Sequence, residues 1–313
     1  MRYFSTEERC LQYIELLKWG EKGWKCFRCG KTEYYRIYER HLNRCKNCHY
    51  DESYTANTVM RNTRRPLTDW FYAIYAVSTN KTGMSAMELY RQTGAGSYST
   101  CWLILHKIRL AMTEPWKEKL DFDVEADETY IFTRGKKGGR KVGGKKALIV
   151  GAVEVGGFGK KIKSGRGRLR AIGSASSKNL NSFIRDHVEQ GSIVRTDGWK
   201  GYSGLKELGY EHRPTILKRP EDASRKLPRI HRLFSNLKTW IKGTHRYVSR
   251  KHLQNYLNEH LIRFNNRNRP IEVFNDILRL MVRAEPRTYR EFVKPRRPAY
   301  PNPLDTATKK VIK

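Results

Sequence analysis

The spacing of hydrophobic residues changes twice along the chain. Apolar positions three and four residues apart predict helices over residues 4–19, 67–79, 84–92 and 98–112. After Pro115, apolar runs and alternations predict strands over residues 122–132, 146–155, 168–175, 192–195 and 210–215. Helical spacing interrupts these strands at 178–189 and returns over 229–241, 250–265 and 271–283. Strands with flanking helices predict a mixed α/β domain.

Four cysteines near the N-terminus have the spacing of a metal site. The pattern Cys-x2-Cys occurs twice, fifteen residues apart, at Cys26, Cys29, Cys45 and Cys48. Two residues between thiolates let one tight turn aim both sulfurs at the same ion, and two such turns complete a tetrahedral site. The sequence therefore predicts a zinc ribbon with structural Zn2+. Cys10 and Cys101 lie on apolar helix faces and are expected in the core.

Residues 84–112 have the length and the central break of a helix-turn-helix. Gly94 and Gly96 in the break can adopt the positive φ that such turns need. The second helix would present short polar side chains to phosphates and base edges, namely Ser97, Tyr98, Ser99 and Thr100. Any two packed helices have this pattern, so the DNA-binding interpretation depends on its neighbours in the chain.

The charge of the chain supports a polyanionic partner. Lys and Arg number 63 against 31 Asp and Glu, a formal net charge of +32. Because self-repulsion of this size opposes compaction, we expect the protein to lie along nucleic acid; a ribosome-associated or simply basic protein is the alternative. The glycine-rich segment 134–146 is predicted to be a flexible loop with DNA-binding side chains at Lys136, Lys137, Arg140 and Lys141.

The chain has no membrane signal. No stretch approaches the ~20 apolar residues that span a bilayer, and the N-terminus lacks an apolar signal core. We therefore expect a cytoplasmic, nucleoid-associated protein without a membrane partner.

Two aspartates stand at predicted strands and are candidates for catalysis. Asp127 lies within the strand-like segment 123–131, and Asp197 follows the short apolar strand 192–194. On neighbouring strands, they would hold divalent ions ~3.5–4 Å apart, as phosphoryl transfer requires. Asp123 and Glu125 share a strand face with Asp127, so the pattern does not choose among the three acids. A turn at Asp197-Gly198 and a surface ion pair for Asp127 are the structural alternatives.

Short motifs follow one another from about residue 20 to residue 270. After the cysteine pairs come LTDWFYAIY at 67–75, KTGMSA at 81–86, ADETYI at 126–131, TDGW at 196–199, GTH at 243–245, HLQNYL at 252–257 and RFNNR at 263–267. The series resembles the bacterial zinc-ribbon, DDE-type insertion-sequence transposases related to Merlin elements. This resemblance implies an RNase H-like catalytic domain and Mg2+-dependent cleavage and transfer of DNA strands. It also implies binding of double-stranded DNA, both terminal inverted repeats and target, by a dimer or larger assembly.

The resemblance also assigns the acids, with one departure. The family's first two acids correspond to Asp127 and Asp197, because its motif reads acid-Glu-Thr-Tyr. Its third position is often Glu with Lys seven residues later; here Lys238 follows His231, and branches of the family carry His or Asn there. A neutral imidazole binds Mn2+ better than Mg2+ and can carry a proton. His231 is thus a ligand, an acid or base, or the mark of a weakened enzyme, with Asn236 in reserve; Lys238 would orient DNA or offset charge.

The predicted organisation has four parts. They are a helix and zinc ribbon at 1–60, a helical DNA-binding region at 61–116, an RNase H-like catalytic domain at 117–285 and a Pro-rich basic tail at 286–313. The predicted function is a DNA transposase that uses two metal ions. The alternatives are a non-catalytic, zinc-dependent DNA-binding regulator derived from a transposase, which His231 in place of Glu leaves open, and a nuclease that cuts without joining.

Overall fold

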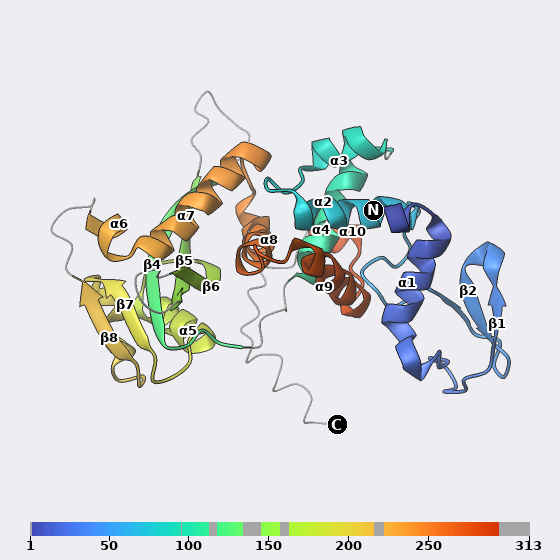
Figure 1. Ribbon diagram of the computed structural model, residues 1–313, viewed down its shortest axis with the longest axis horizontal. Coiled ribbons are helices and arrows are strands. Elements are labelled where there is room, and N and C mark those ends of the chain that lie inside the picture. Colours follow the sequence, from blue (N-terminus) through green and yellow to red (C-terminus); the bar gives the residue numbers. More distant parts are fainter. Residues whose placement is uncertain are drawn as a thin grey trace. The chain divides into compact units, whose positions relative to one another are not determined.

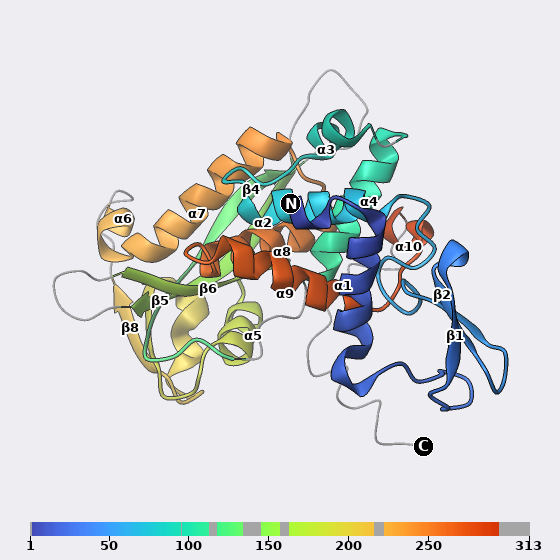
Figure 2. The same cartoon turned by 45° about the vertical axis from the view of Figure 1, so that its right-hand side comes forward.

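The computed structural model describes residues 2–94, 96–112, 118–133, 145–156, 163–215 and 222–293 (Figures 1 and 2). The chain divides into two compact units. The N-terminal unit contains Met1–Thr113 and Asn268–Lys294, and the sheet unit contains Glu114–Arg267 with Pro295–Lys313. Among the described residues, no helix combines the length and the apolar character needed to cross a membrane.

The N-terminal unit joins a small sheet to a group of helices. Its strands are β1 (Tyr34–Ile37), β2 (Leu42–Cys45) and β3 (Asp51–Ser53), which pair antiparallel in the order β1-β2-β3. Its α-helices are α1 (Glu7–Trp19), α2 (Leu67–Thr79), α3 (Ala86–Thr93), α4 (Tyr98–Ala111), α9 (Pro270–Arg283) and α10 (Tyr289–Val293). Single 3-10 turns lie at η1 (Arg2–Phe4), η2 (Gly20–Lys22) and η3 (Tyr38–Arg40).

Side chains that the sequence places before each helix explain where these helices begin. Ser85 precedes α3, and its hydroxyl accepts a hydrogen bond from the backbone N–H of Glu88 at 3.1 Å. Gly94 ends α3 with φ of 60°, the left-handed conformation that favours glycine. The start of α2 is capped by a residue distant in sequence: the carboxylate of Glu7 accepts a hydrogen bond from the backbone N–H of Leu67 at 2.7 Å. The predicted helix pair over 84–112 is therefore confirmed as α3, a turn and α4.

The C-terminal helix α9 corrects a predicted boundary. We expected residues 271–283 in the catalytic domain, but α9 belongs to the N-terminal unit, where it packs on α1, α2 and α4. Its ring at Phe274 lies 6.1 Å from that of Phe71, and Tyr13 donates a hydrogen bond to Asn275 at 3.0 Å. The apolar face of α9 packs against apolar faces of these three helices. Sequence periodicity shows that each helix has an apolar face but does not show which faces pack together. Within the predicted tail, residues 289–293 form α10, and residues 294–313 lie outside the described part.

The sheet unit is built on five strands. They are β4 (Asp123–Thr133), β5 (Lys145–Gly156), β6 (Lys163–Ile172), β7 (Ile193–Asp197) and β8 (Glu211–Thr215). The order is β6-β5-β4-β7-β8, with β4, β5 and β6 antiparallel and β7 and β8 parallel to β4. Three antiparallel strands followed by two parallel strands on the other side of the first make the topology of the RNase H-like fold. The predicted fold class is confirmed.

Helices cover both faces of this sheet (Figure 1). They are α5 (Ser177–His187), α6 (Asp222–Lys226), α7 (Pro228–Trp240) and α8 (Leu253–Asn265), with the turns η4 (Lys200–Leu205), η5 (Ile241–His245) and η6 (Arg250–His252). Helices α7 and α8 share one core with the sheet through Ile230, Phe234 and Leu257, and α5 shares the other through Leu180 and Phe183. Helices α5, α7 and α8 each bury one apolar stripe, which is why helical spacing predicted them, whereas the short α6 was not predicted.

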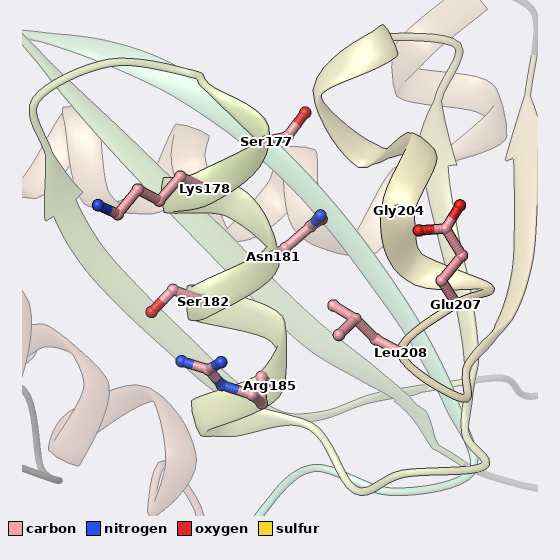
Figure 3. Close-up of a pocket in the computed structure, with 8 residues that line it drawn as sticks. All are labelled: Ser177, Lys178, Asn181, Ser182, Arg185, Gly204, Glu207 and Leu208. Carbon is pink, nitrogen blue, oxygen red and sulfur yellow. The ribbon is translucent and has the colours of Figure 1, made fainter.

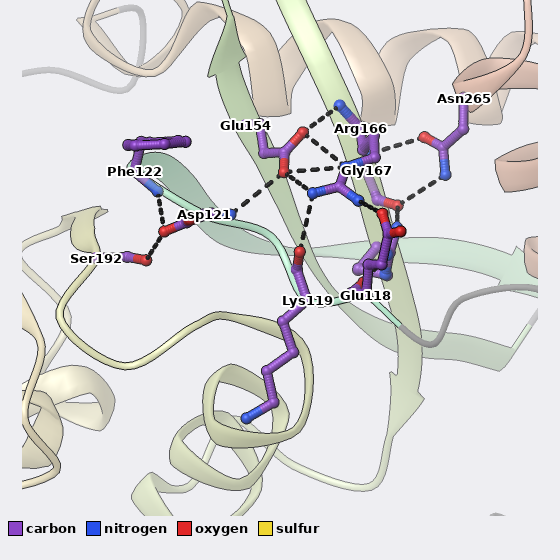
Figure 4. A network of polar contacts seen from close by, with 10 residues as sticks. Glu118, Lys119, Asp121, Phe122, Glu154, Arg166, Gly167, Ser192 and Asn265 are labelled. Atoms are coloured by element: carbon purple, nitrogen blue, oxygen red, sulfur yellow. Dashed lines mark hydrogen bonds and ion pairs between the residues drawn. The ribbon is translucent and has the colours of Figure 1, made fainter.

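A polar network fixes the start of β4 (Figure 4). Arg166 on β6 donates to the carboxylate of Glu154 on β5 at 2.6 Å and to the backbone carbonyl of Lys119 at 2.9 Å. Glu154 also accepts from the backbone N–H of Asp121 at 3.2 Å. Because these contacts join β5 and β6 to the segment that leads into β4, they hold the strand that carries the candidate acids.

Candidate functional site

The four cysteines of the predicted zinc ribbon come together. Their sulfur atoms all lie within 4.8 Å of one another, and Sγ of Cys26 is 3.5 Å from Sγ of Cys48. Four thiolates around one zinc ion at about 2.3 Å would stand about 3.8 Å apart, so the cluster fits that ion. The backbone N–H of Lys31 lowers the pKa of the Cys29 thiol to about 6, whereas burial raises the pKa of the neighbouring Cys48 thiol to about 12, so in the metal-free cluster Cys29 is the favoured thiolate.

Both turns of this cluster have the same backbone form. Gly30 follows the first cysteine pair with φ of 74°, and His49 follows the second with φ of 55°. Each turn closes with a backbone hydrogen bond to the first cysteine of its pair, from Gly30 to Cys26 at 2.9 Å and from His49 to Cys45 at 3.1 Å. All six cysteines are free thiols, and Cys10 and Cys101 are fully buried in the helical core, as predicted.

The two candidate aspartates lie on adjacent parallel strands. Strand β4 pairs with β7 in a register that sets Asp123 against Ile193 and Glu125 against Arg195. The same offset, continued for two residues, sets Asp127 beside Asp197 at the carboxyl end of β7. Parallel strands lie about 4.8 Å apart, so the two carboxylates are neighbours on one sheet face.

The other two acids on this face of β4 already have partners. Asp123 forms an ion pair with Arg195, where Nε lies 2.8 Å from Oδ1. Glu125 is 1% exposed and pairs with Arg229 at 2.7 Å. Its carboxylate also accepts from the backbone N–H groups of Arg229 and Ile230 at 2.7 and 3.1 Å, so it caps the N-terminus of α7. Of the three acids left open by the sequence, Asp127 is the one that makes no ion pair with an arginine among the described residues.

Glu125 should therefore matter for stability rather than for chemistry. The change Glu125→Ala leaves the guanidinium of Arg229 buried without its carboxylate and uncaps α7, which should cost about 3–5 kcal/mol of unfolding free energy. Chemical denaturation measures the loss of unfolding free energy, and hydrogen exchange at β4 and α7 shows where the structure is weakened. The control is Glu211→Ala, which breaks a half-exposed pair with Arg213 and should cost less than about 1 kcal/mol. Equal losses would contradict the capping role.

Burial dominates the electrostatics of Asp127. Its side chain is 8% exposed, and this burial raises its pKa to about 7, with the neighbouring carboxylates of Glu128 and Asp197 adding to the rise. Oδ1 accepts one hydrogen bond, from the backbone N–H of Glu128 at 2.8 Å. Asp197 is half-buried and accepts from the backbone N–H of Trp199 at 3.1 Å.

His231 on α7 faces Asp127. Its Nε2 lies 3.3 Å from Oδ2 of Asp127, but this contact lacks hydrogen-bond geometry, and Nε2 is buried without a hydrogen-bond partner. Burial lowers the pKa of His231, which favours the neutral ring. A glycine makes the approach possible: Gly151 pairs with Asp127 across β4 and β5, and a Cβ there would lie 2.8 Å from the ring of Phe234. Because Gly151 has no side chain, α7 can pack close enough to the sheet to bring His231 to Asp127.

Lys238 lies two turns further along the same helix face. Its Nζ donates to the hydroxyl of Thr129 on β4 at 2.7 Å, and its charge lowers the pKa of Asp127. Asn236, the reserve candidate, is exposed, and no contact joins it to either acid in the described structure. Asp127, Asp197, His231 and Lys238 are thus placed on one side of the sheet by β4, β7 and α7.

Sequence reasoning missed a third acid at this end of the sheet. Glu128 lies on the opposite face of β4, where burial raises its pKa and the hydroxyl of Tyr202 donates to its carboxylate at 2.9 Å. Its charge interacts with that of Asp197. The motif ADETYI contained the signal, because Glu128 directly follows Asp127, but alternation alone assigned it to the other face.

Other predicted contacts have mixed outcomes. Ser97 is the cap of α4 and accepts from the backbone N–H of Thr100 at 3.2 Å, and its hydroxyl lies 2.8 Å from that of Ser99. Tyr98 is half-exposed. DNA contact by these residues stays a prediction. The predicted loop residues Lys136, Lys137, Arg140 and Lys141 lie outside the described residues.

A surface pocket of about 450 Å³ lies between α5 and η4 (Figure 3). It is lined by Ser177, Lys178, Asn181, Ser182, Arg185, Gly204, Glu207 and Leu208. None of the predicted site residues lines it. Likewise, of the described side chains, the four cysteines are the one group of three or more His, Cys, Asp or Glu whose donor atoms are already clustered for a metal.

Comparisons with known proteins identify the family. The sequence profile of the ISXO2-like transposase domain matches residues 119–265, and that of the transposase zinc-ribbon domain matches residues 5–51. No curated protein matches the chain. A chain of the simian T-cell lymphotropic virus intasome in complex with PP2A regulatory subunit B56 gamma is 12% identical, with 61% of this chain and 68% of that chain covered and a TM-score of 0.33. The Mos1 transposase paired-end complex with left transposon end is 14% identical, with 66% and 78% covered and a TM-score of 0.28.

The family assignment depends on the two profiles rather than on these distant structural likenesses. The profiles match separate segments, and between them they span more than half of the chain. The zinc-ribbon profile contains all four clustered cysteines, and the transposase-domain profile contains both candidate aspartates and His231. The chain belongs to the ISXO2-like family of zinc-ribbon insertion-sequence transposases.

Proposed function

We propose that this transposase cuts and joins DNA by metal-dependent phosphoryl transfer at Asp127 and Asp197, with His231 as the third site residue. The supporting observation is the register of β4 and β7, which aligns the two acids at one end of the sheet while α7 brings Nε2 of His231 to 3.3 Å from Asp127. Bound Mg2+ or Mn2+ would activate the attacking hydroxyl and stabilise the leaving oxygen.

The side chains present fit such ions. Two carboxylates suit Mg2+, and a neutral imidazole with a buried, unbonded nitrogen suits Mn2+ better than Mg2+. Burial lowers the pKa of His231 and so favours the neutral ring, in which one nitrogen carries no proton and can bind a metal. Lys238, held on Thr129, would bind the phosphate beside the acids and offset its charge. In the N-terminal unit, structural Zn2+ would stabilise the ribbon.

The proposed substrate is double-stranded DNA, both the terminal inverted repeats of the element and its target. A net charge of +32 favours such a polyanion. We propose that the α3–α4 pair, including Ser97, Tyr98, Ser99 and Thr100, and the basic residues Lys136, Lys137, Arg140 and Lys141 contact this DNA. Joining two ends implies at least a dimer on DNA.

The test is a cleavage and strand-transfer assay. The purified protein is mixed with duplexes that carry the terminal repeats found beside its gene, a target plasmid, and Mg2+ or Mn2+. Joined products in which the two target strands are attacked at positions a fixed number of base pairs apart support the proposal. Cleavage without joining would indicate a nuclease, and specific binding without cleavage would indicate a regulator.

Ionisation of Asp127 should oppose folding of the metal-free sheet unit. Its pKa is about 7 in the folded chain and about 3.9 for an exposed aspartate, so its stabilising contribution is fully present below about pH 4 and is lost as the pH rises through 7. Asp127→Asn cannot ionise, so its unfolding free energy should rise relative to the wild type between about pH 4 and pH 8. Both proteins are measured without chelator, because a chelator would also remove zinc.

Added Mg2+ or Mn2+ separates metal binding from burial in the same experiment. At about pH 8 the ions should raise the unfolding free energy of the wild type more than that of Asp127→Asn, because the variant lacks one of the proposed carboxylate ligands. Equal stabilisation of both proteins would show that Asp127 is not a ligand.

A further inference from the structure

Two aromatic rings are exposed on β4, beyond Asp127. Tyr130 is 56% exposed and Phe132 is 60% exposed, whereas the alternate residues Ile131 and Thr133 are buried. Because side chains alternate along a strand, Ile131 and Thr133 fix the two rings on the opposite face of the sheet from α7. Burial of an aromatic ring is among the larger gains in folding, so two neighbouring rings left in water indicate a binding surface.

A lysine completes this surface. Lys146 is exposed and pairs directly with Phe132 across β4 and β5. Its Nζ lies 5.9 Å from the ring centroid of Tyr130 and 5.8 Å from that of Phe132. We call Tyr130, Phe132 and Lys146 the aromatic–lysine patch. It combines flat apolar faces with a positive charge, and the acid of the adjacent rung, Glu128, is already bound by Tyr202.

The patch is not an unfinished part of the core. The core beneath α5 includes Leu148 on β5 and Ile172 on β6, and Tyr130 pairs with Leu148 in the same row across the sheet. Within the sheet unit, the described members of this core do not extend beyond that row. In the described part of the chain, no strand pairs with the outer half of β4 on the side of β7, and we call this edge the open edge. Strand β7 ends at Asp197, and beyond this point the described contact on that side of β4 is the bridge between Thr133 and Val248.

The patch lies close to the acids along the strand. Tyr130 is three residues from Asp127, about 10 Å at the rise of a β-strand. A DNA strand bound at Asp127 and Asp197 can therefore cross the open edge of β4 and reach the rings within a few nucleotides. In a duplex the faces of the bases are hidden by stacking, so two flat rings on a strand can bind bases only when these are unpaired.

We propose that the aromatic–lysine patch binds unpaired nucleotides next to the cleavage site, with bases stacked on Tyr130 and Phe132 and a phosphate bound by Lys146. The identity of the occupant as DNA rests on the proposed function. The net charge of +32 and the lysine beside both rings favour a polyanion such as DNA over a partner protein with few acidic residues.

The test uses oligonucleotides that contain 2-aminopurine, whose fluorescence is quenched by stacking. Binding is measured for a single strand and for a fully paired duplex, without added divalent ions. Tyr130→Ala and Phe132→Ala should each weaken single-strand binding roughly 5- to 100-fold and relieve the quenching, with duplex affinity changed less than about twofold. Lys146→Gln should reduce the salt slope for the single strand by about 0.7.

Matched variants control for folding and for exposure. Tyr130→Phe keeps the ring and should keep both affinity and quenching. Phe122→Ala removes a ring that is 80% exposed at the other end of β4 and should change neither. Loss of duplex and single-strand binding to the same extent, or unchanged quenching in Tyr130→Ala and Phe132→Ala, would overturn the proposal. Binding of a protein instead of DNA by the patch would show itself as that unchanged quenching.

The two proposals fail separately. Asp127→Asn should quench 2-aminopurine like the wild type, because stacking needs no cleavage. A wild type that stacks bases and never cleaves DNA would overturn the proposed function alone. A protein that cleaves and joins DNA and shows no stacking on the rings would overturn the patch alone.

Discussion

Asp127→Asn and Asp197→Asn should each reduce strand cleavage by about a thousandfold or more and leave DNA binding intact. Each change replaces a carboxylate ligand with a neutral amide, and the loss of a bound metal removes several kcal/mol of transition-state stabilisation, at tenfold in rate per 1.36 kcal/mol. Binding should be unchanged or slightly tighter, because a negative charge next to the phosphate is removed. Cleavage is measured in single-turnover reactions, and binding is measured by titration of the same duplex.

Asp123→Asn is the matched control for these two changes. Asp123 lies on the same strand and the same face, four residues before Asp127. Its carboxylate is paired with Arg195. The substitution should cost modest stability, because that pair is partly exposed, and change the cleavage rate less than about tenfold. A loss of activity in Asp123→Asn as large as in Asp127→Asn would mean that the site depends on the charge of the whole strand face rather than on one ligand.

The strands and helices around the site could be predicted because their signal is local. The alternation along residues 122–132 and the three- and four-residue spacing along 229–241 state which face is buried, and β4 and α7 follow them closely. The alignment of Asp127 with Asp197 is less local, because it needs β4 and β7 to be parallel neighbours in one register. The ordered motifs supplied that information through the family resemblance.

The choice among Asp123, Glu125 and Asp127 could not be made from periodicity. It depends on Arg195 and Arg229, which lie 72 and 104 residues away from their partners. The position of α9 has the same cause: its apolar face is visible in the sequence, but the faces of α1, α2 and α4 that receive it are equally visible and equally unspecific. Periodicity predicts which face of a helix or strand is buried, but it does not predict which other element packs against that face.

Side chains with two uses were also beyond prediction. Ser97 and Thr100 are short and polar at the start of α4, which fits both contact with DNA and helix capping, and the observed hydrogen bond is the cap. Gly151 shows the converse, since a glycine within a predicted strand gave no hint that it lets α7 approach Asp127. These are contacts of the folded chain, and they decide function only after the fold is known.

Cys26→Ser should unfold the zinc ribbon and remove about one zinc ion per chain. The core around the metal cluster is small: its buried members are Trp24 and two of the cysteines themselves, with partly buried rings around them. Structural zinc contributes about 10–16 kcal/mol of binding energy to small zinc modules, far more than such a core supplies. Zinc content is measured per chain by elemental analysis, and folding is measured by hydrogen exchange at β1 and β2.

The consequence for DNA should be selective, because the ribbon and the sheet belong to different compact units. Binding to the terminal repeats should weaken, while the unfolding transition of the sheet unit stays where it is in the wild type. Cys101→Ser is the control, since that thiol is as fully buried as Cys26 but lies on α4, away from the cluster; it should cost stability and keep the zinc. If Cys26→Ser retained its zinc, or if Cys101→Ser lost it, four thiolates could not be the site, and the short hairpin between them would need another source of stability.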